Sequence, residues 1–447
     1  MWVYQPGRGM PTAHARRVSA GSYAACTVVI GLLATSVHAE GPALTFGEAE
    51  RIAIERSQRI AAQDLSVAAA RERGAAAGAL PDPVLKLGVD NLPVDGPARF
   101  STQRDFMTMR RIGLSQEWVR SSTRQLREAR GAGTVKLTEA ERQVTLGSVQ
   151  RATAVAWLDA HYAAAALTEL EGQKKQSEGE TAAVEAAYRE GRGKLVDVFA
   201  ARSASAEIGD GAIDATRRLR VAQSSLARWV GDSANQLLAG RPAIDEIPWH
   251  RHELAAQLDD HPDIRLAKQR SELARTDLKL AEAATKPDWT VELSYAARGE
   301  AFSNMVSVGI AVPLQVNRRD RQSREIAARR AELAQAEADR EDMRREHVAE
   351  IDALLAQWDS DRARRDRYQT DIVPLAAHRS EAALAAYRGG RGTLADVLAA
   401  RRNEIDVHLK ALEVEASAAR AWALLTYLVP APSNPPSTRE PSEESLP

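Results

Sequence analysis

Alternating apolar and polar side chains mark two short β-regions in this chain. Between residues 289 and 295 every second side chain is apolar, and the same alternation runs over residues 306–312 and 85–90. Residues 107–118 form a less regular partner for the strand at residues 85–90. A period of two is typical of strands with one apolar and one polar face. The pattern predicts two β-hairpins, over residues 84–118 and 289–314.

Helical periodicity fills most of the remaining chain. No glycine or proline occurs between Arg318 and Val373, and apolar residues recur at helical spacing, as at Ile351, Leu354, Leu355 and Trp358. A helix from Arg318 to Arg388 would be on the order of 100 Å long. Pro374 is expected to kink it, because proline removes one backbone hydrogen bond and clashes with the preceding turn. The chain is therefore predicted to be mainly α with a small β part.

The two halves of the chain repeat one plan. Residues 187–202 read AYREGRGKLVDVFAAR and residues 386–401 read AYRGGRGTLADVLAAR, so that 12 of 16 positions are identical at a constant offset of 199. Pro-Asp precedes the first strand of each hairpin, at residues 81 and 287. Alanine-rich helices share scattered alanines by chance, but not the same Tyr, Gly, Leu and Asp in register, so the chain is a duplication. Each repeat is expected to run helix, β-hairpin, long helix, glycine turn, helix.

Composition sets the predicted domain limits. The first 39 residues resemble a cleaved signal peptide, with Arg16 and Arg17 before an apolar run and Val37-His38-Ala39 as the cleavage site; the alternative is a transmembrane anchor, for which the run is short. Cys26, the only cysteine, lies inside that segment, so a mature chain would contain no thiol. The predicted segments are a signal peptide (1–39), a first repeat (40–234) with its tip at 188–198, a linker (235–250), a second repeat (251–429) with its tip at 387–397, and a disordered tail (430–447).

Charge and motifs exclude several function classes. The formal net charge is −1, which argues against nucleic acid as a partner. The run Gly191-Arg192-Gly193-Lys194 has neither the spacing of a phosphate-binding loop nor a preceding strand. His250-x-His252 lacks a third ligand at helical spacing, so a polar linker explains it better than a metal site. No catalytic, cofactor or metal site is predicted, and the chain is not expected to be an enzyme.

Taken together, these features resemble the TolC-like outer membrane efflux factors over nearly the whole mature chain. The resemblance rests on ALTFGEAERIAIERS at residues 43–57, the Pro-Asp hairpin entries, VGIAVPL at 308–314, and the two Tyr-x-x-Gly-x-x-x-Leu-x-Asp-Val tips. It implies a homotrimer whose chains each add four strands to a 12-stranded barrel in the outer membrane. Coiled-coil helical hairpins would continue as a tunnel across the periplasm. The implied partners are a periplasmic adaptor, an inner-membrane pump of the RND type and outer membrane lipid, and the implied function is passive efflux.

The glycines of the two tips are expected to reverse the chain. Glycine adopts a positive φ at low cost and so ends a helix within a tight turn. The four tip-turn residues are Gly191, Gly193, Gly390 and Gly392.

The resemblance also assigns a periplasmic gate to the tips. The matching positions are Asp197, Tyr387 and Asp396. Gly392 stands where the family has its basic partner, and Arg391 lies next to it. Asp396 would attract cations at the mouth of the channel, although Ala399 occupies the position of a second acidic ring. Helix capping is an equal alternative for the two aspartates.

Apolar tip residues are candidates for docking of the adaptor. These are Leu195, Val198, Leu394 and Val397, and packing inside the hairpin is the alternative, at least as strong for the two valines.

The short predicted external loops, 93–106 and 298–304, resemble the heavy-metal branch of the family. The export of metal ions and the export of small toxic compounds both remain open. The rival function is a periplasmic coiled-coil adaptor, which would carry a single hairpin between small β-domains.

Overall fold

The computed structural model describes residues 43–247 and 258–428. These residues lie in one compact unit, Pro42–Pro447. The predicted signal peptide, the tail, and the pair His250 and His252 lie outside the described residues.

Helices form most of the described chain, as expected, and the first repeat is built around a single very long one. Thr45 and Ser57 cap α1 and α2 through their hydroxyls, which accept hydrogen bonds from the backbone N–H of Glu48 and Ile60. The helices of the first repeat are α1 (Phe46–Arg56), α2 (Gln58–Ala76), α3 (Ser121–Arg189) and α4 (Leu195–Val230), followed by the short 3-10 turn η1 (Gly231–Asn235).

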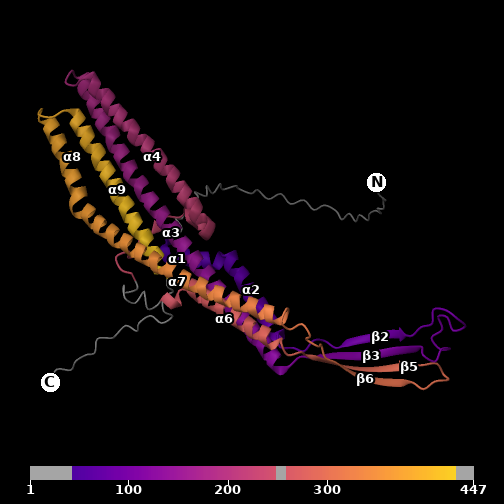
Figure 1. The fold of residues 1–447 in the computed structure, drawn as a ribbon. Coiled ribbons are helices and arrows are strands. Elements are labelled where there is room, and N and C mark those ends of the chain that lie inside the picture. The colour runs from indigo at the N-terminus through magenta and orange to yellow at the C-terminus, as the bar shows by residue number, and fades with distance from the viewer. Residues whose placement is uncertain (1–42, 248–257, 429–447) are drawn as a thin grey trace, which may run out of the picture. The chain divides into compact units, whose positions relative to one another are not determined.

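The second repeat follows the same order. It contains the 3-10 turn η2 (Leu258–Asp260) and the helices α6 (Pro262–Ala283), α7 (Gln322–Arg367), α8 (Val373–Arg388) and α9 (Leu394–Thr426). A π-helical turn, η3 (Tyr368–Ile372), joins α7 to α8 immediately before Pro374. The helix path bends between α7 and α8 (Figure 1). The kink expected at Pro374 is thus present, with the change in hydrogen-bond pitch in the turn before the proline.

The four predicted strands join into one antiparallel sheet. Its strands are β2 (Val84–Asp90), β3 (Met109–Trp118), β5 (Trp289–Ala297) and β6 (Met305–Ala311), in the order β2-β3-β5-β6. The two repeats meet where β3 pairs with β5 along Arg110–Trp118. The sheet follows the ends of α6 and α7 opposite to the hairpin tips (Figure 1). A second, parallel pair joins β1 (Leu44–Thr45) to β4 (Leu238–Ala239).

Tryptophan indoles hold both β1 and the segment that connects the repeats. The indole N–H of Trp157 donates to the carbonyl of Leu44 at 3.2 Å, and that of Trp358 donates to the carbonyl of Ile244 at 3.1 Å. Trp422 donates in the same way to Glu246 at 2.8 Å. Ile244 is fully buried in the main core. The described part of the predicted linker is therefore packed against the helices of both repeats.

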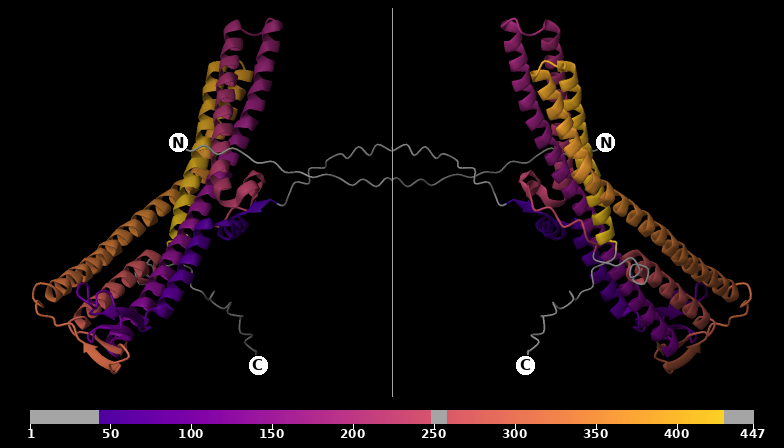
Figure 2. Two further views of the ribbon diagram at one scale, coloured as in Figure 1. Left: turned by 90° about the vertical axis from the view of Figure 1, so that its right-hand side faces the viewer. Right: turned by 90° about the vertical axis from the view of Figure 1, so that its left-hand side faces the viewer.

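Each repeat contributes one helical hairpin, α3–α4 and α8–α9, and the two run side by side to their tips (Figures 1 and 2). Of the helices that the structure describes, none combines the length and the apolar character needed to cross a membrane.

Candidate functional site

One face of the four-stranded sheet is apolar and exposed. Strand register aligns Leu85, Leu114, Leu293 and Val308 in a row across all four strands. These side chains are 50–72% exposed. A second row, Leu87, Ile112, Tyr295 and Val306, lies beside it with 43–71% exposure. We call these eight residues the apolar sheet face. Two adjoining rows of large apolar side chains exceed the scattered apolar exposure that is ordinary on a protein surface.

The opposite face of the sheet is polar. Lys86 and Glu292 form an ion pair there at 2.6 Å between Nζ and Oε2, and Arg111 pairs with Asp90. The two faces are thus sharply divided, as the alternation in the sequence predicted. The outer edges of the sheet, on β2 and β6, have no strand partner within the described residues.

The two hairpin tips share one backbone geometry. Gly191 and Gly390 have φ angles of 75° and 70°. In the first tip the N–H of Gly191 donates to the backbone carbonyl of Tyr188 at 3.0 Å, and in the second the N–H of Gly390 donates to the backbone carbonyl of Tyr387 at 3.0 Å. Equivalent residues make equivalent bonds, so the turn itself is duplicated.

The other two tip glycines are needed for a different reason. Neither Gly193 nor Gly392 has a positive φ, so the expectation of that conformation at all four glycines is wrong. A Cβ at Gly193 would come within 3.0 Å of the backbone nitrogen of Tyr188, and one at Gly392 within 3.2 Å of Tyr387. Their role is close approach of the turn to the end of the preceding helix, where only a hydrogen side chain fits easily.

Most of the expected docking ridge is buried. Val198, Leu394 and Val397 are only 2–7% exposed, in a cluster with Val184 and Ala201 that joins the α3–α4 hairpin to α9. We call these five residues the tip cluster. The expectation of a ridge of four exposed residues is therefore corrected for these three, because packing between the hairpins takes up their surface. Leu195 remains 49% exposed, beside Val196 and Phe199, which are 66% and 60% exposed and which the sequence analysis did not single out.

Asp396 caps α9. Its Oδ2 accepts hydrogen bonds from the N–H and the hydroxyl of Thr393 at 3.0 and 2.6 Å, while Thr393 Oγ1 accepts one from the N–H of Asp396 at 3.3 Å. This reciprocal arrangement is a capping box. The Thr393 hydrogen bonds hold the pKa of the Asp396 carboxyl below its usual value. Asp197 occupies the corresponding first turn of α4, which begins without a side-chain cap at Lys194.

The proposed gate residues lie at the tips but are not joined to one another. Tyr387 packs partly buried against the tip cluster, and Arg391 is exposed in the second turn. Within the described part of the chain, no hydrogen bond or ion pair is found between any two of Asp197, Tyr387, Arg391 and Asp396.

Several ion pairs connect the hairpins further from the tips. Arg402 of α9 pairs with Glu207 of α4 at 2.6 Å, and Arg401 pairs with Glu180 of α3 at 3.5 Å. Arg401 ends the repeated segment 386–401 and Arg402 follows it. Their partners are distant in the chain, so sequence spacing does not reveal them.

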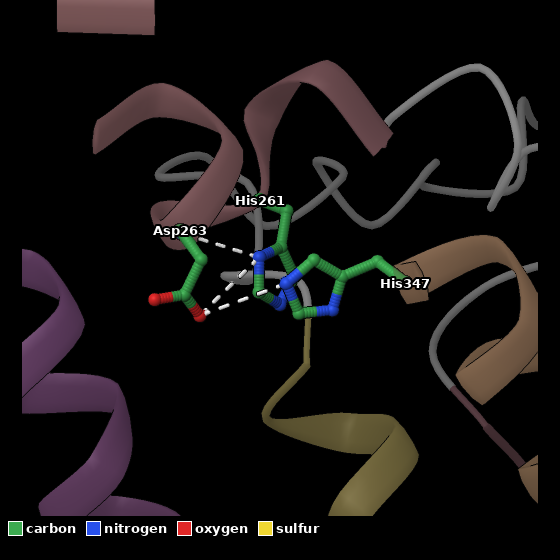
Figure 3. A group of neighbouring side chains, drawn as sticks. All are labelled: His261, Asp263 and His347. Carbon is green, nitrogen blue, oxygen red and sulfur yellow. Dashed lines mark hydrogen bonds and ion pairs between the residues drawn. The ribbon is translucent and has the colours of Figure 1, made fainter. Parts of the chain in front are cut away.

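A cluster of three side chains of metal-ligating types lies away from the tips and was not found from the sequence. His261 caps the start of α6, Asp263 follows in its first turn, and His347 extends from α7 (Figure 3). One ligand atom from each lies within 4.8 Å of the others. His347 is 84 positions from Asp263, and no motif connects them. Only His261 before Pro262 gives a local signal, which is that of a helix start.

Comparison with known proteins agrees with the resemblance derived from the tips. Residues 254–429 match the family model of the outer membrane efflux protein. The cobalt-zinc-cadmium resistance protein CzcC of Cupriavidus metallidurans is 27% identical over 237 residues, which cover 51% of this chain and 55% of CzcC. The chain thus spans about half the length of this curated relative.

Solved outer-membrane channels share the fold. The CusC structure aligns with a TM-score of 0.71 at 17% identity, over 86% of this chain and 91% of CusC. The OprN channel aligns with a TM-score of 0.73 at 15% identity, over 86% and 90% of the two chains. VceC of Vibrio cholerae aligns with a TM-score of 0.66 at 17% identity, over 85% and 96%.

Proposed function

Residues 254–429 match the family model of the outer membrane efflux protein, and on this basis we propose that the chain is a member of that family and the outer membrane channel of a tripartite efflux pump. It acts as a passive exit duct for metal ions or small toxic compounds, and it is not an enzyme. The observation that carries this proposal is the apolar sheet face, exposed on a chain that has the fold of outer-membrane channels.

The sheet supports the proposal because its apolar face is uncovered and its two edges, on β2 and β6, are unpaired within the described residues. A soluble sheet covers its apolar face with helices or a second sheet, whereas these eight side chains stay 43–72% exposed. Lipid covers such a face when closure of the strands satisfies the edges. Three chains would join β6 of each to β2 of the next and so form a 12-stranded barrel. The helical hairpins then continue as a tunnel in the periplasm.

The tips support contact with a periplasmic adaptor and an RND-type inner-membrane pump. In this proposal the docking surface is the exposed group Leu195, Val196 and Phe199 on α4, rather than the three buried residues of the tip cluster. Crosslinkers placed at Leu195 should capture the adaptor in cells, and crosslinkers at buried Val397 should not. Capture from neither position would remove the docking surface from the proposal.

The gate is proposed at the mouth formed by the tips. Three copies of Asp396 would concentrate cations there, since the carboxylate is exposed and its capping bonds keep it ionised. Asp396→Ala is expected to weaken cation selectivity in single-channel recordings, and unchanged selectivity would remove this role.

Metal ions are included among the substrates because the relative CzcC is named for cobalt, zinc and cadmium resistance. Deletion of the gene in its host should then sensitise cells to metal ions and leave drug sensitivity unchanged. Drug sensitivity alone would favour small toxic compounds instead.

The channel function is tested by ion conductance of the purified protein in planar bilayers together with the mass of the assembly. A conducting trimer is expected. A non-conducting monomer would favour the rival adaptor function, although an adaptor with two hairpins and a shared four-stranded sheet does not fit the single hairpin expected of that class.

A further inference from the structure

His261, Asp263 and His347 bring three potential metal ligands together from two helices. The Nδ1 atom of His261 lies 3.7 Å from Oδ2 of Asp263, and Nε2 of His347 lies 3.9 Å from the same oxygen. Figure 3 shows the two rings and the carboxylate turned toward one point. The ring centroids of the two histidines are 4.1 Å apart.

The side chain of His347 is oriented by a second carboxylate. Glu350, one turn further along α7, lies 3.1 Å from Nδ1 of His347. A proton on Nδ1 satisfies this contact and leaves the Nε2 lone pair directed at Asp263. Carboxylates that fix the tautomer of a metal-binding histidine in this way are a regular feature of metal sites.

The side chain of His261 is buried and has an unfilled hydrogen-bonding position. It is 1% exposed. Its Nδ1 accepts a hydrogen bond from the N–H of Asp263 at 3.2 Å, and its buried Nε2 has no partner among the described residues.

Three electron-donating atoms therefore face one another at the start of α6. Tetrahedral zinc, with bond lengths of about 2.0–2.2 Å, places its ligand atoms about 3.3–3.6 Å apart. The two separations from Oδ2 of Asp263, 3.7 and 3.9 Å, need only a small contraction, and one nitrogen of each histidine lies within 4.8 Å of the other. The carboxylates of Asp263 and Glu350 contact the two rings, which favours a cation over an anion there.

We propose that His261, Asp263 and His347 bind a divalent transition-metal ion that links the start of α6 to α7. Two imidazole nitrogens and one carboxylate oxygen suit zinc, with cobalt as a close substitute, and leave a fourth position for water. Ligation by His261 replaces its hydrogen bond from the N–H of Asp263. The site is a structural brace, and it does not depend on what the channel exports.

Zinc binding by the full-length protein, purified in detergent and freed of metal, tests the site. One zinc ion per chain is expected by metal analysis and titration calorimetry. His347→Ala should weaken binding by about 100-fold or more, and Glu350→Gln by about 10- to 100-fold, since the latter removes only an orienting partner. The control His378→Ala alters an exposed histidine on α8 and should bind zinc as the wild type does.

Two further measurements keep the result independent of folding defects. Bound cobalt should show the visible absorption of a tetrahedral site in the wild type and lose it in Asp263→Asn, which preserves side-chain shape. Zinc should slow hydrogen exchange at the start of α6 in the wild type and not in His347→Ala. Absence of zinc from the wild type, or equal binding by the wild type and His347→Ala, would overturn the proposal and leave a proton-linked ionic cluster.

Discussion

A single charge placed on either face of β6 should distinguish lipid from water on the two sides of the sheet. Val308 is the middle residue of β6 and is 72% exposed on the apolar sheet face, opposite Leu293 in the middle of β5. Its neighbour Ser307 is exposed on the polar face, opposite Ser294. Val308→Arg and Ser307→Arg therefore add the same charge to the same strand, one position apart.

The expected difference follows from what covers each face. Arginine at the middle of a lipid-facing strand costs about 2–4 kcal/mol, which corresponds to about a 30- to 700-fold shift in the folding equilibrium per chain at about 1.4 kcal/mol per factor of ten. In a trimer the three copies together would cost about 6–12 kcal/mol. An exposed arginine on a face covered by water changes stability by about 0.5 kcal/mol or less. Val308→Arg should thus be strongly destabilising and Ser307→Arg nearly neutral.

Folding of the purified variants into phospholipid vesicles over a urea series provides the assay. Trp118 and Trp289 stack at 5.9 Å between ring centroids, at one end of their paired strands, and their fluorescence reports sheet formation directly. The urea midpoint should fall for Val308→Arg and stay near that of the wild type for Ser307→Arg. Fractionation of cells should show the same order in the outer membrane.

Equal midpoints for the two arginine variants would refute the reasoning, because the two faces would then contact the same medium. A larger loss for Ser307→Arg would place lipid on the polar face, which the ion pair of Lys86 with Glu292 argues against.

Three further outcomes are expected at the tips. Gly390→Ala should destabilise the second tip by about 1–2 kcal/mol because of the positive φ, whereas Gly209→Ala, in α4 with open space around it, should stabilise by about 0.5–1 kcal/mol; chemical unfolding measures both. Leu394→Ala should cost about 2–5 kcal/mol because its side chain is buried in the tip cluster, and Leu195→Ala about 0.5 kcal/mol or less because its side chain is half exposed; the reverse order would contradict the burial. Asp396→Ala should speed hydrogen exchange in the first turn of α9 at neutral pH. The lowered pKa of Asp396 means that its carboxylate stabilises the fold above the unfolded-state pKa, and that this contribution is lost as pH falls through the folded-state value, so the variant and the wild type should converge in acid.

Local patterns in the sequence predicted the strands and long helices well because each depends on neighbours only a few positions away. Alternation at 289–295 predicted the exposed row of Leu293, and Pro374 predicted the bend between α7 and α8. The direct pairing of β3 with β5 depends on residues about 180 positions apart, and no period in the sequence encodes it.

Contacts between distant segments explain what the sequence did not predict at the candidate sites. His347 meets His261 and Asp263 only because α7 packs against α6. Residues 235–250 are predicted from the sequence only as a linker, yet the indoles of Trp358 and Trp422 reach its carbonyls from α7 and α9.

The two tips show most clearly where sequence reasoning ends. Their backbone turns match because the hydrogen bonds of Gly191 and Gly390 close over short stretches that differ only at Glu190 and Gly389. Burial does not match: Leu195 is 49% exposed, while its counterpart Leu394 is 7% exposed. Burial depends on the neighbouring hairpin, and α9 packs against the first hairpin on the side that carries Leu394. Duplication in sequence therefore predicts equal turns but not equal burial: of the pair Leu195 and Leu394 only Leu195 is exposed, whereas Val198 and Val397 are both buried.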